Sequence, residues 1–192
     1  LINYHTYHPS WGDPMYEFLR GEEAEDDFCY VRFEEGSWYT IGGVPTTYTN
    51  GSYSYVNENM ASGPLSEMTP VQISLAGTTI DGPDIQVRVT ISSSSDLTSN
   101  NSLYLFIAAT LDNVDYEGYN GEKHHQDVFL GWITDGMNGE LLSLAEKEKS
   151  KSYTWQMPSN WPQNNFETTW PQVEWDAANL QVVAFIQDQS TK

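Results

Sequence analysis

The sequence contains a single cysteine, Cys29, among its 192 residues. One thiol cannot form an intramolecular disulfide, and it cannot supply the Cys-x-x-Cys pair that thiol-disulfide oxidoreductases use. A hydrophobic core must therefore hold the fold together, and 39% hydrophobic residues are enough for one in a chain of this length. We do not expect the chain as it stands to be an enzyme of the thiol-disulfide exchange class.

Basic residues are also scarce. Eight Lys and Arg residues face 27 Asp and Glu residues, which gives a formal net charge of −19. Such a surface repels phosphate backbones and anionic membranes, so we expect no nucleic-acid partner. A strong negative charge favours solubility in a salty or extracellular medium. The richness of the sequence in Ser, Thr, Asn, Tyr and Trp favours an extracytoplasmic protein (secreted, periplasmic or at the cell surface).

Long apolar runs, targeting signals and cofactor motifs are missing too. No stretch approaches 18 consecutive apolar residues, so no membrane span is expected. The chain begins at Leu1 without a start methionine or a signal-peptide pattern, and we expect it to be truncated or processed there. No Gly-x-Ser-x-Gly, Walker, His-Glu-x-x-His or dinucleotide motif is present, and we expect no cofactor.

Residues 1–68 mix strand and helix signals. Residues 1–7 alternate apolar and polar side chains, and Asp13-Pro14 places a proline at the first position of a helix. A second helical pattern over residues 22–36 has acidic first turns and ends at a glycine. The order of strand, helix and further strand is typical of α/β structure.

Residues 39–51 are the most informative part of this segment. Val44-Pro45 precedes a β-prone run, and Asn50-Gly51 is the strongest short signal for a hairpin. Proline lacks a backbone donor and permits a cis bond, so it belongs at the start of an edge strand. A strand entered in this way is typical of thioredoxin-like folds, in which the loop faces the redox motif.

Beyond residue 68 the pattern changes to short strands without convincing helices. Only residues 141–149 could form a helix instead. Turn-forming clusters of Gly, Asn, Asp and Ser separate the strands, which predicts an antiparallel sandwich of about 120 residues. The predicted strands cover residues 71–75, 85–91, 103–111, 128–133, 153–157 and 180–186.

Several short motifs, in order along nearly the whole chain, point to one family. They are Asn3-Tyr4-His5, Asp13-Pro14-Met15, Arg32, Tyr39, Gly43-Val44-Pro45-Thr46 with Asn50-Gly51, Asn120-Gly121-Glu122-Lys123-His124-His125, Tyr153-Thr154-Trp155 and Leu180-Gln181-Val182-Val183-Ala184-Phe185-Ile186-Gln187-Asp188. In these motifs the chain resembles the Omp28-related family, whose members join a thioredoxin-like domain to a C-terminal β-sandwich.

The resemblance implies an α+β protein with two domains. Residues 1–68 would form a thioredoxin-like α/β unit that lacks its first strand and helix, and residues 69–192 would form the antiparallel β-sandwich. The missing elements would carry any Cys-x-x-Cys, and Cys29 cannot replace it because it lies in the later acidic helix. Val44, Pro45 and Thr46 would form a substrate-facing loop. A homodimer would cover the apolar surface that the missing elements expose.

An aromatic loop near the C-terminus is a candidate binding site. Trp155, Trp161 and Trp170 lie in a region rich in Pro, Asn and Gln, and exposed tryptophans of this kind can stack on sugar rings. The alternative, which we favour, is that these rings anchor a long loop onto the sandwich, because large aromatic side chains dominate core energetics.

The loop over residues 112–122 offers oxygen ligands of the kind that calcium prefers, and Asp115, Glu117 and Asn120 are the candidates. The EF-hand register fails, because with Gly118 at the sixth position the twelfth residue is His124 and not glutamate. We favour a solvated acidic loop over a metal site.

Two functions fit these observations best, and an enzyme of the hydrolase kind ranks third. The first is an extracytoplasmic Omp28-like protein with a binding or thiol-linked maturation role, catalytically incomplete because the chain lacks a Cys-x-x-Cys. It would be a thiol-disulfide oxidoreductase only if a preceding segment carried that motif. The alternative is a secreted β-sandwich module that binds a glycan or a protein.

Overall fold

The structure is a computed structural model. It describes residues 2, 47–49, 52–54, 69–79, 84–97, 102–115, 117, 121–134, 138–144, 147–156 and 177–191. Val44, Pro45, Thr46, Asn120, Trp161 and Trp170 lie outside the described residues.

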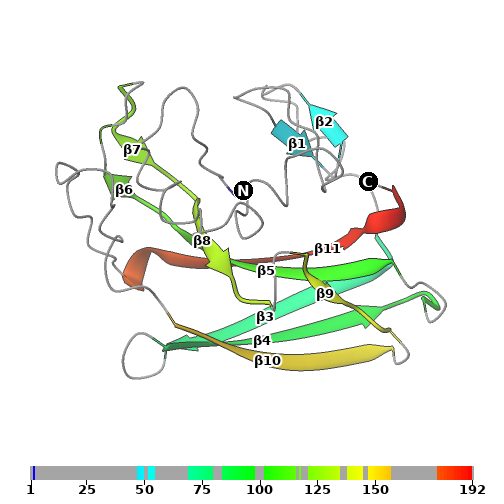
Figure 1. The fold of residues 1–192 in the computed structure, drawn as a ribbon. Coiled ribbons are helices and arrows are strands. Elements are labelled where there is room, and N and C mark those ends of the chain that lie inside the picture. Colours follow the sequence, from blue (N-terminus) through cyan, green and yellow to red (C-terminus); the bar gives the residue numbers. More distant parts are fainter. Residues whose placement is uncertain are drawn as a thin grey trace.

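Two antiparallel sheets face each other and form a sandwich (Figure 1). The first sheet, in the order β10-β4-β3, consists of β10 (Glu148–Gln156), β4 (Asp84–Ser93) and β3 (Val71–Thr79). The second sheet, in the order β11-β5-β8, consists of β11 (Leu180–Asp188), β5 (Leu103–Leu111) and β8 (Val128–Trp132), and β9 (Glu140–Leu141) also pairs with β5.

Smaller elements complete the described part of the chain. A hairpin pairs β1 (Thr47–Thr49) with β2 (Ser52–Ser54), and these strands flank the predicted turn at residues 50 and 51. A second short pair joins β6 (Val114–Asp115) to β7 (His124–His125). Two 3-10 helices, η3 (Ala177–Asn179) and η4 (Gln189–Thr191), bracket β11.

The core lies between the two sheets and follows the strand alternation that the sequence predicts. On β4 and β5, every second side chain points into it and is less than a tenth exposed. These side chains are Ile85, Val87, Val89 and Ile91 from β4, and Leu103, Leu105, Ile107, Ala109 and Leu111 from β5.

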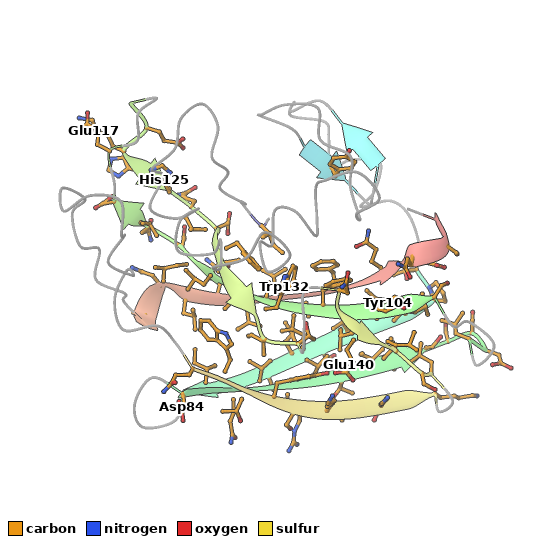
Figure 2. The ribbon with its side chains drawn as sticks, viewed as in Figure 1. Asp84, Tyr104, Glu117, His125, Trp132 and Glu140 are labelled. Atoms are coloured by element: carbon orange, nitrogen blue, oxygen red, sulfur yellow. The ribbon has the colours of Figure 1, made fainter. Side chains whose placement is uncertain are left out.

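The second sheet is also covered on its outer face. The alternate β5 residues Phe106, Ala108 and Thr110 have no exposed surface. The Phe106 ring stacks on the Phe185 ring of β11, with the ring centroids 5.0 Å apart. The ring centroid of Trp132 on β8 lies 5.3 Å from that of Phe106 (Figure 2). An aromatic layer therefore packs against this face, which explains why β5 reads as one continuous apolar run.

The predicted α+β fold class is wrong. The described residues form antiparallel sheets and two 3-10 helices, without an α-helix among them. Within residues 1–68 the described strands are those of one antiparallel hairpin, which pairs with neither large sheet and is not a thioredoxin-like unit. The homodimer predicted to cover an exposed thioredoxin-like surface loses its basis with this correction.

The helical alternative for residues 141–149 is also wrong. Leu142 and Leu144 are both buried while Leu141 and Ser143 are exposed, and a period of two belongs to extended chain rather than to a helix. The domain boundary after residue 68 stays a prediction. No helix in the described part of the chain has the length and apolar character needed to cross a membrane.

Candidate functional site

One small cavity lies among the described residues of the sandwich. It has a volume of about 10 Å³ and lies at the edge formed by β9 and β10, where Glu140, Lys151 and Tyr153 line it together with core residues such as Val89 and Leu142. This volume corresponds to a single water molecule, whereas sites for small organic ligands are typically several hundred Å³. The edges of the two sheets offer surface positions for a binding site.

One edge is closed by polar contacts between β9 and β10. Glu140 Oε2 on β9 accepts a hydrogen bond from Lys151 Nζ at 2.6 Å and one from Tyr153 Oη at 3.0 Å (Figure 2). The Lys151 ammonium also lies 4.8 Å from the centroid of the Tyr153 ring. These contacts join the two sheets across the edge.

The same contacts shift two pKa values. Partial burial alone would raise the pKa of Glu140, but the hydrogen bonds from Lys151 and Tyr153 and the nearby positive charges outweigh it, and the pKa is lowered. Burial, and then the hydrogen bond to the Glu140 carboxylate, raises the pKa of Tyr153 well above its usual range. Both shifts are explained by a structural contact and do not require a catalytic role.

Charges protect this edge against pairing with another chain. Lys149 and Lys151 are on the core-facing side of β10, because residues two apart in a strand share a side and Tyr153 of the same series packs against the core. Inward-pointing charges on an edge strand are a common device against unwanted strand addition, because a second strand would bury them. We call β10 together with β9 the protected edge.

Among the described residues, the opposite edge has no such protection. β3 has the sequence Val-Gln-Ile-Ser-Leu-Ala-Gly-Thr-Thr, with neither a charged residue nor a proline in nine positions. Among the described strands it pairs only with β4. Val71 and Ile73 are partly buried against the core, but Leu75 is 42% exposed although it is on the same side of the strand. A long, uncharged edge strand is a natural template for another strand.

The register shows which backbone groups of β3 are free. β3 and β4 pair with Val71 opposite Ser93, and the Ser94 N–H donates to the Pro70 carbonyl at 2.9 Å one step earlier. Since antiparallel partners alternate between bonded and non-bonded pairs, the even-numbered β3 residues bond to β4 and the odd-numbered ones point their N–H and C=O groups outward. Thr69 Oγ1 accepts from the Val71 N–H at 3.2 Å, so the free edge begins at Ile73.

β11 lies next to β3 on the same side of the sandwich. From Leu180 to Gln187 it carries no charge, and its core-facing residues are only half-buried. We call β3 together with β11 the open edge. Its apolar side chains are Val71, Ile73, Leu75, Leu180, Val182, Ala184 and Ile186.

The outer face of the first sheet is mostly polar, and its charged residues are Asp84, Arg88 and Glu148. Residues opposite one another form rows across the three strands, such as Ser74, Thr90 and Ser150. Within this row Thr90 Oγ1 and Ser150 Oγ share a hydrogen bond of 2.8 Å. Arg88 lies in the next row, between Ala76 and Ser152. None of the three strands places an aromatic side chain on this face.

The one described member of the predicted aromatic set faces inward. Trp155 is half-buried on the core side of β10. Its indole packs against the backbone of Gly131 on β8, since a Cβ at Gly131 would lie 3.8 Å from two atoms of the ring. The role of the aromatic loop stays a prediction, because Trp161 and Trp170 lie outside the described residues.

The predicted metal ligands Asp115 and Glu117 each contact a basic side chain. Asp115 Oδ1 lies 2.7 Å from His124 Nδ1 across the β6–β7 pair, and Glu117 Oε2 lies 3.4 Å from Lys123 Nζ. All four side chains are largely exposed, and Glu117 lies far from the two sheets (Figure 2). Among the described residues no group of three or more His, Cys, Asp or Glu side chains could hold a metal ion.

The open edge was missed from the sequence, although a signal was present. Residues 71–79 contain no charge, whereas residues 148–151 contain three. The predicted strand over residues 153–157 excludes these charges, so a comparison of the predicted strands did not separate the two edges. The order of strands within each sheet decides whether a strand is at an edge. The charge of a single strand does not predict this order.

No family model matches this chain. No curated protein matches it either. A solved structure with a similar fold is HBP35 of Porphyromonas gingivalis, with a TM-score of 0.58 and 18% sequence identity. The similarity covers 78% of this chain and 49% of that one, so this chain spans about half the length of its structural relative. At this identity the chain shares a related fold with HBP35, and no family is assigned by it.

Proposed function

We propose that this protein is an extracytoplasmic, Omp28-like binding protein that contacts a protein partner by strand addition at β3. In this mode, an extended segment of the partner forms main-chain hydrogen bonds with the edge of an existing sheet, and its alternate side chains contact the neighbouring surface. The partner would add to the first sheet beside β3 and cover Leu75.

The observation that carries the proposal is the contrast between the two edges. β10 has Lys149 and Lys151 on its core side and is joined to β9 through Glu140. β3 has Ile73 and Leu75 in the corresponding inward positions and no charge anywhere. Proteins generally protect long edge strands. An unprotected edge strand in a sheet whose opposite edge is protected therefore indicates a binding function for that strand.

The wider assignment rests on composition and motifs. The net charge of −19 favours solubility outside the cytoplasm, and the ordered motifs of both halves support the Omp28-like name. A thiol-linked role receives no support, because the described part of residues 1–68 lacks a thioredoxin-like unit and Cys29 is the only thiol. Trp155 is poorly placed to bind a glycan, because its ring packs against the core.

A photo-crosslinking experiment tests the proposal. A photoreactive amino acid replaces exposed Gln72 on β3 in one variant and exposed Thr154 on β10 in a matched control. Both are incubated with the extracytoplasmic fraction of the source cells, and crosslinked peptides are identified by mass spectrometry. We expect position 72 to capture one extended segment of one protein, and position 154 to capture none.

A proline pair then tests whether the backbone edge carries the binding. Leu75→Pro removes an outward N–H without removing a bond to β4, and Ser152→Pro does the same on the protected edge. Capture should fall at least tenfold in Leu75→Pro and stay unchanged in Ser152→Pro. Equal capture at both edges, or capture that survives Leu75→Pro, would refute the proposal.

A further inference from the structure

We infer that the segment added at β3 is β3 of a second copy of this chain, paired antiparallel about a two-fold axis at Leu75. The inference rests on the proposed use of the β3 edge and names its occupant. The product is a dimer with one continuous sheet of six strands, in the order β10-β4-β3 followed by the same strands of the partner in reverse.

The backbone of β3 is compatible with this symmetry. The free N–H and C=O groups belong to the odd-numbered residues, as the register with β4 shows. In an antiparallel pair centred on residue 75, odd residues meet odd residues, so each free donor faces a free acceptor. Leu75 and the partner's Leu75 then form a bonded pair on the axis, and Ile73 lies opposite the partner's Gly77.

The side chains are compatible with it as well. Leu75 is one of two large hydrophobic residues that are conspicuously exposed in the described part of the chain, and pairing about the axis covers it with its own copy. Gly77 leaves space beside the strand, because a Cβ there would meet only one atom within 4 Å, the Gln86 carbonyl oxygen at 3.7 Å. The larger Ile73 of the partner would occupy that space. A two-fold axis repeats this contact, so Ile73 of each copy lies opposite Gly77 of the other and the two strands are complementary in shape.

The distribution of charge favours β3 over other surfaces as the contact between two copies. Each chain carries −19, so two copies repel over most of their surfaces. β3 is uncharged, and identical β3 strands can lie side by side without a like-charge pair. A second copy should therefore bind more tightly as salt is added, because screening shortens the repulsion to about 10 Å or less. A basic partner would show the opposite dependence.

Light scattering coupled to gel filtration measures the association. The wild-type chain should elute as a monomer of 21.8 kDa when dilute and at twice that mass when concentrated, with the midpoint moving to lower concentration in high salt. Leu75→Lys and Leu75→Glu should each stay monomeric, because like charges would meet on the axis. An equimolar mixture of the two should recover the dimer, since Lys then meets Glu.

A cysteine pair tests the register without relying on a charged variant. In a Cys29→Ser background, Leu75→Cys places two thiols on the axis at the spacing of a bonded strand pair, within reach of a disulfide. The matched control Gln72→Cys places them six residues apart along the strands, about 20 Å. Mild oxidation should crosslink the first variant and not the second, with circular dichroism confirming that both are folded.

The outcomes separate this inference from the proposed function. A wild-type chain that stays monomeric at every concentration, or a dimer that crosslinks equally through residues 72 and 75, overturns the β3 homodimer. If photo-crosslinking at position 72 still captures a different protein, the β3 edge is used as proposed and only its occupant is wrong. If neither a copy nor another protein is captured, both conclusions fall.

Discussion

Lys151 Nζ lies 2.6 Å from Glu140 Oε2, and this contact joins β10 to β9 at one edge of the sandwich. The Glu140 side chain is only 25% exposed, so the pair is less well solvated than a typical surface ion pair. β3 carries no charged side chain with which to form an equivalent contact at the opposite edge. The two edges therefore differ in composition, in bonding and, as we propose, in use.

Replacing Glu140 with Gln should lower the free energy of unfolding by about 1 kcal/mol near neutral pH, because the carboxylate no longer pairs with Lys151 or accepts a charge-assisted hydrogen bond from Tyr153. Urea unfolding measures the loss. Lys123→Gln is the control, since its partner Glu117 is 68% exposed and that pair should contribute nothing measurable. Equal effects of the two substitutions would mean that burial of Glu140 does not matter.

The contribution of Glu140 should depend on pH with a defined sign. Its pKa is lowered in the folded protein, so the unfolded chain binds the proton more tightly. The stabilisation should be complete well above about pH 4.5, the ordinary value, and should disappear as the pH falls through the lowered pKa. Wild-type and Glu140→Gln stabilities, measured across this range, should converge in acid. A difference that persists at the lowest pH would contradict this assignment.

Tyr153 should ionise later than an ordinary tyrosine. Its burial and its hydrogen bond to the Glu140 carboxylate raise its pKa above the usual value of about 10. The folded state thus binds this proton more tightly, and its stabilising effect is present below about pH 10 and lost as the pH rises further. The ultraviolet difference titration of wild-type against Tyr153→Phe isolates this phenol. Ionisation near pH 10 in the folded protein would contradict both the burial of the phenol and its contact with Glu140.

Gly139 and Gly121 offer a matched pair for testing the aromatic layer. Both have positive φ, of 76° and 82° respectively, so alanine costs about 1–2 kcal/mol at either position through the backbone alone. At Gly139 a Cβ would also lie 2.6 Å from Phe106 Cζ, whereas at Gly121 it meets nothing within 4 Å.

The Phe106 ring cannot move aside easily, because it has no exposed surface and packs on Phe185 and Trp132. Gly139→Ala should therefore lose about 1–3 kcal/mol more than Gly121→Ala in thermal or urea unfolding. Similar losses in the two variants would indicate that the aromatic layer is loosely packed.

The strands with a strong apolar signal were the easiest to predict from the sequence. Residues 103–111 were predicted as a strand with the bounds of β5, and residues 85–91 fall within β4. β10 begins at Glu148, five residues before the start of the predicted strand. The prediction started too late because Glu148, Lys149 and Lys151 favour helix by propensity. The pairing of β10 with β4 overrides that local preference, and no pattern within residues 148–156 reports the partner.

The candidate site was harder to predict for the same reason. The exposure of Leu75 depends on β3 being at the edge of its sheet, which follows from pairings between residues far apart in the sequence. The inward position of Trp155 depends on the register of β10 with β4. The predicted thioredoxin-like unit failed because it was inferred from a local motif around Pro45 and a family resemblance. The described strands of that segment form only a hairpin.

Residue-resolved hydrogen exchange of the β3 amides tests the central claim most directly. In dilute protein, the amides of Gln72, Ser74 and Ala76 should exchange slowly because they bond to β4, and those of Ile73 and Leu75 should exchange fast. At high protein concentration, or with a captured partner, exchange at Ile73 and Leu75 should slow at least tenfold while Ser74 stays unchanged. Fast exchange of the Leu75 amide under every one of these conditions would contradict the use of β3 as a binding edge.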